Sequence, residues 1–120
     1  LLLHIHAIAQ GLRILGGLIM SKLLSIETNL KPINDRCKSF YGKASVIRYE
    51  NTYLKSYDTI VCYVDTDGVF HRTWKGYSAT TMRHIKEFTT QILGRSITKK
   101  EWDSMTVEPE PIISRGIFMD

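Results

Sequence analysis

Hydrophobic residues recur at three- and four-residue steps after Ser78, and this spacing predicts an amphipathic helix over residues 79–93. Ser78 is a favourable N-cap because its hydroxyl can accept a hydrogen bond from an amide of the first helical turn. Gly94 follows the last apolar position, where glycine commonly ends a helix. Both ends of the helix are therefore predicted together with its apolar stripe. The stripe consists of Ala79, Met82, Ile85, Phe88, Ile92 and Leu93, with Thr89 as its one polar member.

From Lys43 the period of the hydrophobic pattern changes to two, which predicts strands separated by short turns. The clearest turn is Asp65-Thr66-Asp67-Gly68, because Asp-Gly readily supplies the positive φ that a tight hairpin needs. The third strand is apolar on both faces, so we expect it in the interior of the sheet. Its two faces would carry Ile60, Cys62 and Val64 on one side and Thr59, Val61 and Tyr63 on the other. The first strand is expected from Lys43 to the turn near Glu50-Asn51. The other three are expected at Tyr53–Tyr57, Thr59–Val64 and Val69–Trp74.

Sequential strands joined by short turns predict an antiparallel meander, and the helix is expected to pack its stripe on one face of it. The predicted fold class is therefore α+β, with about four strands in residues 43–75. Thr98 and Glu101 have capping-box spacing, which predicts a second, short helix near residues 99–105. Two earlier stretches stay open. Residues 20–29 are too short a pattern to assign, and residues 35–41 fit either a short helix or an extended lead-in.

The chain of 120 residues has the length of one domain with a modest core. Changes in composition divide it further. The predicted parts are an apolar leader over residues 1–19, an N-terminal lead-in over 20–42, the α+β domain over 43–105 and an acidic tail over 106–120.

The apolar leader has three interpretations. A membrane span needs about 20 apolar residues, and the uncharged run ends at Leu12. A signal peptide would have a basic start and a small-x-small cleavage site, which this stretch lacks. The third is that the natural protein starts at Met20 and that residues 1–19 are a translated leader. A purine-rich ribosome-binding site upstream of Met20, if translated, would be read as glycine codons, and Gly16-Gly17 lies at that place. We favour the third, and expect the leader to lie outside the fold with no membrane association.

The formal charge of +4 is unevenly distributed along the chain. Residues 36–100 carry twelve Lys or Arg against five Asp or Glu, whereas residues 101–120 carry one against five. A basic domain suits nucleic acid or an acidic protein face, and equally a solvated surface. The two cysteines, Cys37 and Cys62, are too few for a disulfide framework and form no CxxC pair. This usage favours a reduced, intracellular protein.

Three stretches carry a resemblance to known proteins. They are SFYGKA (residues 39–44), SYDT (residues 56–59) and YSATTMRHIKEF (residues 77–88). The chain resembles small single-domain proteins of unknown function that are encoded by bacteriophages and prophages of Gram-positive bacteria. The likeness runs from about Lys38 to Gly94. It implies a compact domain with an accessory role in the cytoplasm of a bacterial host cell, and it implies no activity or catalytic residue.

No constellation of residues in the sequence fixes a reaction. His71 and His84 are expected on adjoining elements and could meet Cys62, but no motif marks a nucleophile and its base. His84 lies at the margin of the apolar stripe, which favours a packed or capping role. Asp65 and Asp67 resemble the start of a calcium loop, but the later ligand positions hold other residue types. We therefore expect no catalytic residue, no metal and no cofactor.

Cations and aromatic residues interleave along the predicted strands and indicate a binding surface. A sheet face of this kind can stack nucleic-acid bases and neutralise phosphates. Tyr and Trp are also ordinary strand residues, and half of them must face the helix. The candidate binding residues on the strands and the corner after them are Arg48, Tyr49, Lys55, Arg72, Trp74 and Lys75, beside Tyr53 and Tyr63. Arg83 and Lys86 extend the positive charge along the exposed side of the helix.

Two functions agree with this pattern. The first is a non-catalytic phage accessory protein that binds and inhibits or retunes a bacterial host protein or ribonucleoprotein. Counter-defence inhibitors such as anti-CRISPR proteins act in this manner, and exposed Arg, Tyr and Trp are typical interface anchors. The alternative is an RNA- or single-stranded-DNA-binding module that contacts nucleic acid directly through the basic aromatic sheet face. A small enzyme is a third hypothesis without a supporting motif.

Overall fold

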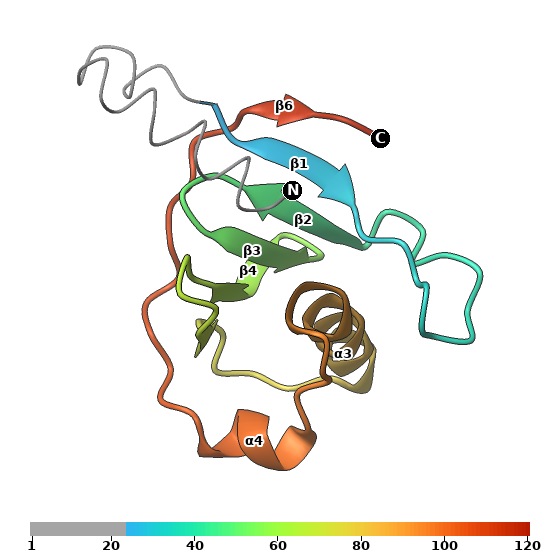
Figure 1. Ribbon diagram of the computed structural model, residues 1–120, viewed down its shortest axis with the longest axis vertical. Coiled ribbons are helices and arrows are strands. Elements are labelled where there is room, and N and C mark those ends of the chain that lie inside the picture. The colour runs from blue at the N-terminus through green and yellow to red at the C-terminus, as the bar shows by residue number, and fades with distance from the viewer. Residues whose placement is uncertain (1–23) are drawn as a thin grey trace.

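The computed structural model describes residues 24–120, so the predicted leader lies outside the described residues. Six strands form one sheet in the order β5-β4-β3-β2-β1-β6, and two helices accompany it (Figure 1). The architecture is α+β, as the sequence predicts. In chain order the elements are β1 (Ile26–Asn29), β2 (Ala44–Arg48), β3 (Thr52–Ser56), β4 (Thr59–Val64), β5 (Phe70–Arg72), α3 (Ala79–Leu93), α4 (Lys99–Ser104) and β6 (Ile117–Phe118).

The predicted meander is formed by β2, β3, β4 and β5, which pair in succession and antiparallel. β4 lies inside the sheet with a partner strand on each side, and both of its faces are apolar because each contributes to a hydrophobic cluster. The hairpin after β4 is closed by hydrogen bonds of 3.0 Å from Asp65 N to Val69 O and from Gly68 N to Asp65 O. Gly68 has the positive φ, 82°, for which glycine is suited. β5 is shorter than the predicted strand and ends at Arg72.

Two strands that the pattern does not predict extend the sheet from four strands to six. β1 pairs antiparallel with β2, and β6 pairs parallel with β1, so the sheet is mixed. β1 has four residues and β6 has two, which is too short for an alternating pattern to be recognised. Residues 30–43, between β1 and β2, form an irregular loop, in place of the short helix or extended lead-in expected over residues 35–41.

A β-bulge in β4 corrects the faces predicted for this strand. Leu54 pairs with Cys62 whereas Lys55 pairs with Ile60, so Val61 is an extra residue on β4. Ile60 is thereby moved from the inner face, which packs on α3, to the outer face. Cys62 stays on the inner face in the main core. The outer face has a smaller cluster of its own, made of Ile47, Tyr53 and Ile60 with Tyr63 and Ile113 packed against it.

Both helices begin where their predicted caps lie. The Ser78 hydroxyl accepts a hydrogen bond of 3.0 Å from Thr81 N at the start of α3, and Gly94 ends this helix with a φ of 75°. Thr98 and Glu101 form a complete capping box at the start of α4. These local signals fix the boundaries because each cap satisfies backbone groups that the helix leaves unpaired.

The main core lies between α3 and the inner face of the sheet. Met82, Ile85 and Phe88 from the predicted stripe are buried against strand residues of β2, β3 and β4. Ala79, the first member of the stripe, is exposed. Polar residues of α3 are buried as well, and Glu87 among them is only 3% exposed. The helix therefore contributes both the hydrophobic contacts of the core and a buried carboxylate.

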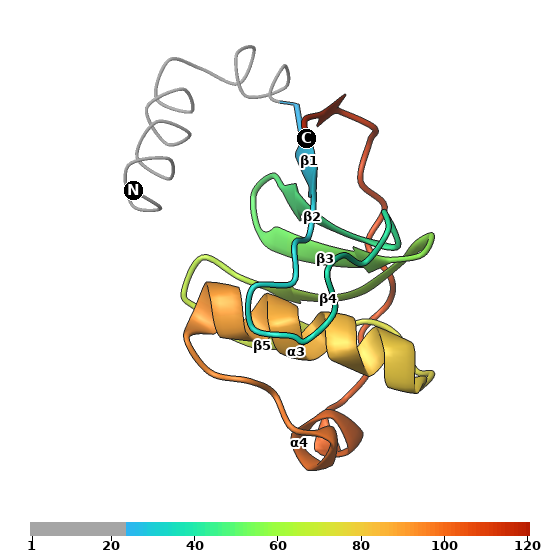
Figure 2. The same ribbon diagram turned by 90° about the vertical axis from the view of Figure 1, so that its right-hand side faces the viewer.

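Residues 107–116, here called the crossing segment, run from α4 to β6 along the side of the sheet (Figures 1 and 2). Val107 forms a bridge with Arg72, and Ile113 packs on the outer-face cluster. The segment then passes so close to Ser25 that a side chain at Gly116 would overlap the Ser25 carbonyl oxygen. The predicted acidic tail thus provides a strand of the sheet and covers part of its outer face.

Candidate binding surface

The loop between β1 and β2 is fastened to α3 by a buried carboxylate. Glu87 accepts hydrogen bonds from the backbone N and the side-chain amide of Asn34, at 2.8 and 2.9 Å. Gln91, one turn later, donates to Glu87 and to the backbone oxygen of Lys31. Figure 2 shows the loop passing across α3 at this end of the molecule. The loop therefore has a defined position although it contains no regular structure.

A second contact joins the loop to the exposed side of α3. The Arg83 guanidinium binds the Asp35 carboxylate through two nitrogens. Hydrogen bonds from Arg83 and then from the Cys37 backbone hold the pKa of Asp35 well below its usual range. The Cys37 thiol also donates to Asp35, which raises the thiol pKa and makes it a poor nucleophile. Arg83 thus faces outward, as predicted, but its charge is paired within the protein.

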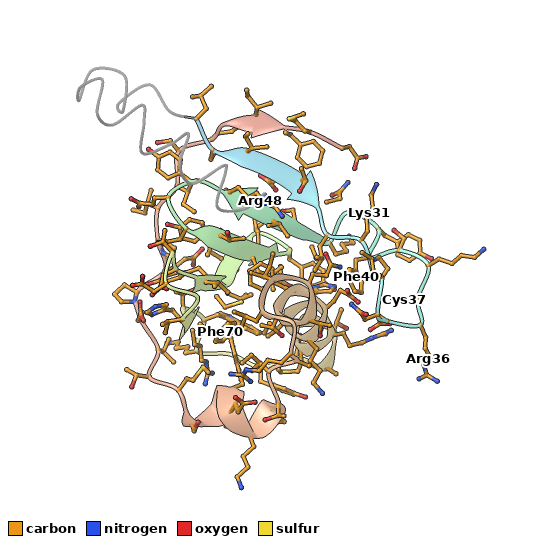
Figure 3. All side chains as sticks on the ribbon, viewed as in Figure 1. Lys31, Arg36, Cys37, Phe40, Arg48 and Phe70 are labelled. Carbon is orange, nitrogen blue, oxygen red and sulfur yellow. The ribbon has the colours of Figure 1, made fainter. Side chains whose placement is uncertain are left out.

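The cations of this loop are exposed and form no ion pair with any residue in the described range 24–120. Asp35, the one acidic residue of the loop, is already bound to Arg83. Figure 3 shows Arg36 extending outward from the loop, with Lys31 near its start and Arg48 over the sheet. Lys86 of α3 is exposed too. The exposed cations of the loop are Lys31, Arg36, Lys38 and Lys43.

We call this region the loop end, defined as residues 31–43, the turn Tyr57-Asp58, and Arg83 and Lys86 of α3. Its two tyrosines, Tyr41 and Tyr57, are exposed. The turn belongs to the same end because Tyr57 N donates a hydrogen bond of 2.7 Å to Lys43 O. Of the binding residues predicted from sequence, the loop end contains Arg83 and Lys86 only.

The basic aromatic sheet face that the sequence predicts does not form. Tyr53 is buried in the outer-face cluster, beside Ile113 of the crossing segment. Lys55 lies on the outer face as well, but it forms an ion pair of 2.8 Å with Glu27. The prediction failed for two physical reasons. Alternate residues of a strand point to opposite faces, and residues beyond position 106 cover part of the outer one.

Arg72 is the clearest correction among the predicted binding residues. It lies on the inner face, only 8% exposed, where its guanidinium donates to four backbone oxygens. These acceptors are the oxygens of Trp74, Trp102, Lys75 and Gly76, at 2.7, 2.8, 3.0 and 3.4 Å. The guanidinium also lies 4.3 Å from the ring centroid of the buried Trp102. Arg72 therefore joins β5, the corner before α3 and the end of α4, and is closed to a partner.

The remaining predicted residues lie apart from one another. Arg48 and Tyr49 are at the end of β2 farthest from the loop end, since the loop joins the first residue of this strand. Arg48 is half-buried and Tyr49 is exposed. Trp74 packs its side chain against the main core, and Lys75 beside it is exposed. These four residues do not combine with Lys55 or Arg72 into one surface.

His71 lies on the outer face between two carboxylates. Its Nδ1 is 2.6 Å from Glu108 of the crossing segment, and its Nε2 is 2.8 Å from Asp65. Tyr63 stacks on the imidazole with 4.5 Å between ring centroids and donates to Glu108 at 2.8 Å. Burial, and next the bond to Glu108, raise the pKa of Tyr63 to about 12. The cluster therefore fastens the crossing segment to β4 and β5.

The same contacts determine the protonation of His71. Partial burial lowers its pKa, but the hydrogen bonds to Asp65 and Glu108 outweigh burial, and the net pKa is raised. An imidazole protonated on both nitrogens has no lone pair with which to accept a proton or bind a metal. His71 is consequently suited to an ion pair rather than to general-base catalysis.

His84 forms a second polar cluster in the main core. Its Nδ1 is 2.8 Å from Ser56 Oγ, which is 3.0 Å from Thr81 Oγ1. The separation of Ser56 Oγ and His84 Nδ1 would suit a nucleophile and its base. However, His84 is only 1% exposed and Ser56 only 2% exposed, so a substrate cannot reach them. Desolvation lowers the pKa of His84 to about 4. Phe40 packs edge-on against its ring at 4.7 Å. His84 has the packed position that its place in the sequence favours.

The sequence allows His71, His84 and Cys62 to meet, but the structure keeps them apart. His71 is on the outer face, whereas His84 and Cys62 are buried on the inner side of the sheet. Burial raises the pKa of the Cys62 thiol. Asp65 uses its other carboxylate oxygen to accept from backbone amides of its own turn. Across residues 24–120, no three His, Cys, Asp or Glu side chains are arranged to hold a metal ion.

The part of the chain that the structure describes contains no helix long and apolar enough to cross a bilayer. The fold and its surfaces thus define a small α+β protein that has one exposed cationic loop end and a partly covered opposite face. The chain belongs to the family of unknown function DUF8033, whose model matches residues 28–104. No curated protein and no solved structure matches the chain. The family match includes the loop end and both helices, and it stops before the crossing segment.

Proposed function

We propose that the protein is a non-catalytic binding protein that engages an anionic surface of a bacterial partner through the loop end. By occupying that surface it inhibits or retunes the partner. The observation that carries the proposal is the set of exposed cations, Lys31, Arg36, Lys38 and Lys43, which lack a carboxylate partner in the described chain. The resemblance to phage-encoded proteins supports a bacterial host and an accessory role. We propose counter-defence of the anti-CRISPR kind because a small chain with exposed Arg and Tyr side chains suits inhibition by surface contact.

The fixed position of the loop favours binding over simple solvation. Glu87 and Arg83, one turn apart on α3, hold the loop at two successive residues, so the backbone that carries the cations has a fixed position. A preorganised surface loses less conformational entropy when a partner binds than a mobile one does. A patch of one charge sign also accelerates encounter with an oppositely charged partner.

The polar clusters of the described chain favour binding over catalysis. Ser56 and His84 have suitable spacing, but burial closes them to substrate. His71 uses both ring nitrogens to hold Asp65 and Glu108. A catalytic base needs an available lone pair within reach of the substrate. Neither histidine of the described chain offers one.

The test is capture of partners from a bacterial lysate with two charge variants of equal net charge. The first variant removes the four loop cations by Lys31→Gln, Arg36→Gln, Lys38→Gln and Lys43→Gln. The matched control removes four cations elsewhere by Arg48→Gln, Lys75→Gln, Lys100→Gln and Arg115→Gln. We expect the loop variant to lose the captured material and the control to retain it. Equal loss in both variants, or capture unchanged by the loop variant, would contradict the proposal.

A further inference from the structure

Tyr41 is held in a backbone conformation that its side chain disfavours. Its φ is 54°, and the following Gly42 has a φ of 74°. These two residues form a turn that is closed by a hydrogen bond of 2.9 Å from Lys43 N to Phe40 O. Two successive positive φ values define a type I′ turn, whose first central position usually holds Asn, Asp or Gly. A bulky residue at this position therefore has a backbone cost that glycine would avoid.

Tyr57 repeats this situation in the neighbouring turn. It is the first residue of the two-residue loop between β3 and β4, where Ser56 pairs with Thr59. Its φ is 57°, again a value that favours glycine. In the described chain, Tyr41 and Tyr57 are the only residues other than glycine with positive φ. Strained residues of this kind concentrate at functional sites, where the side chain itself is needed.

Packing within the protein does not account for Tyr41, and it accounts only in part for Tyr57, whose ring centroid lies 6.0 Å from that of His84. Tyr41 is 76% exposed and Tyr57 is 48% exposed. The adjacent Phe40 is the aromatic residue that enters the core at this end. The two turns are joined by the bond from Tyr57 N to Lys43 O, and Lys43 Nζ lies 5.8 Å from the Tyr57 ring centroid. Two exposed aromatic rings therefore lie on adjoining turns beside a cation.

The surroundings of these rings favour single-stranded nucleic acid as the ligand. The exposed charged residues around the rings are mainly cations, with Asp58 beside Tyr57 as the one exposed carboxylate of the loop end, and Ile33 is the one large aliphatic side chain exposed on the loop. A protein interface would more often have a contiguous apolar centre. Aromatic rings interleaved with cations are the arrangement by which proteins stack successive bases and neutralise the phosphates between them.

We infer that Tyr41 and Tyr57 are stacking platforms for bases of single-stranded RNA or DNA, and that the loop cations contact its phosphates. The inference rests on the proposed function and specifies the anionic partner. Because every base offers a π face, binding is expected to depend little on sequence. Because phosphate contacts release counterions, binding is expected to weaken steeply as salt is raised.

The test is fluorescence anisotropy with labelled oligouridylate and oligothymidylate of about 12 nucleotides, a length within typical binding-site sizes. The wild-type protein should bind at about 50 mM salt and lose affinity as salt increases. Tyr41→Gly and Tyr57→Gly should each weaken binding about tenfold, because each removes one stacking surface. The thermal midpoint of Tyr41→Gly should stay near that of wild type, because glycine suits its backbone position and the ring is exposed. Tyr57→Gly should have a slightly lower midpoint, because it also loses the contact with His84. Tyr41→Phe should bind like wild type because it keeps the ring.

The matched control is Tyr49→Ala, which removes an exposed tyrosine from the opposite end of the sheet and should leave affinity unchanged. The inference is overturned if neither oligonucleotide binds at low salt, or if the glycine variants bind as tightly as Tyr49→Ala. Loop-dependent capture of a protein from nuclease-treated lysate, without oligonucleotide binding, overturns this inference and leaves the proposed function standing. Capture that ignores the loop cations overturns the proposed function itself.

Discussion

Arg72 at the end of β5 and Arg36 in the loop end show how differently one residue type is used in this protein. Arg72 is buried, and four backbone oxygens and the Trp102 ring surround its guanidinium. Arg36 is exposed and forms no ion pair among residues 24–120. The first arginine has all its partners inside the fold. The second has its charge directed to solvent or to another molecule.

The same contrast holds between the outer face and the loop end as whole regions. On the outer face the charges are matched, because Glu27 binds Lys55 while Asp65 and Glu108 bind His71. At the loop end, Arg83 alone has a carboxylate partner. A count of positive residues along the sequence therefore does not locate the proposed binding surface. The surface lies where the fold supplies cations without supplying their partners.

Loss of Arg72 should have the largest effect, because this residue makes the most internal contacts. Arg72→Leu should lower the free energy of unfolding by roughly 3–5 kcal/mol, since several backbone oxygens lose their donor at a cost of about 1–3 kcal/mol each. Denaturant unfolding measures the loss. Arg48→Leu is the matched control, because Arg48 is half-buried and should change stability by about 0.5 kcal/mol or less. Equal effects of the two substitutions would show that Arg72 is no more internal than Arg48.

His84 should give a smaller effect that depends on pH. Its pKa is lowered to about 4 by burial, from an ordinary value of about 6.5. Between these values the unfolded chain binds the proton and the folded chain does not. Stability should therefore fall by about 3 kcal/mol as pH decreases from about 6.5 to about 4.

Unfolding curves over this pH range compare wild type with His84→Gln, in which the acid-side fall should be reduced. His71→Gln is the control, because folding raises the pKa of His71 whereas it lowers that of His84, so the two residues have opposite effects on the pH dependence of stability. The stability that His71 provides is fully present below about pH 6.5 and is lost as pH rises through its folded pKa. If His71→Gln instead removed the loss of stability at acid pH, His71 rather than His84 would be the buried histidine with a lowered pKa, which would contradict the structure.

The smallest expected effect is at Glu108, which is partly exposed on the outer face. Glu108→Gln removes one of the two carboxylates on His71, so the pKa of His71 should decrease in an NMR titration. The free energy of unfolding should fall by about 1 kcal/mol or less, because solvent screens this ion pair. Glu50→Gln, in the exposed turn after β2, should change neither quantity. An unchanged His71 titration in Glu108→Gln would mean that the crossing segment is not fastened through this pair.

The helices and the central meander could be predicted because their signals are local. Ser78 and Gly94 bound α3, and the Asp-Gly turn joins two neighbouring strands. β1 and β6 could not be predicted, because their partners are distant in sequence and the strands are too short for a pattern. The bulge at Val61 could not be predicted either. It moves Ile60 to the opposite face of the sheet, and the run of apolar residues along β4 gives no sign of it.

The candidate site was harder to predict than the fold, because exposure depends on distant partners. Arg72 and Arg83 look alike in the sequence, and only the fold places one among backbone oxygens and the other beside Asp35. Tyr41 and Tyr57 carry no sequence signal of positive φ beyond the glycine after Tyr41. Both tyrosines lie in the SFYGKA and SYDT stretches, whose sequence does not indicate a role for them.

The surroundings of Arg72 also provide an intrinsic fluorescent reporter of folding. The chain has two tryptophans, and both meet this arginine, Trp74 through its carbonyl and Trp102 through its ring. Trp102 is fully enclosed, so its emission should shift to longer wavelength when α4 leaves the sheet and water reaches the indole. The loop end contains no tryptophan. Fluorescence can therefore follow the folding of every loop-end variant through a reporter that the substitutions leave untouched.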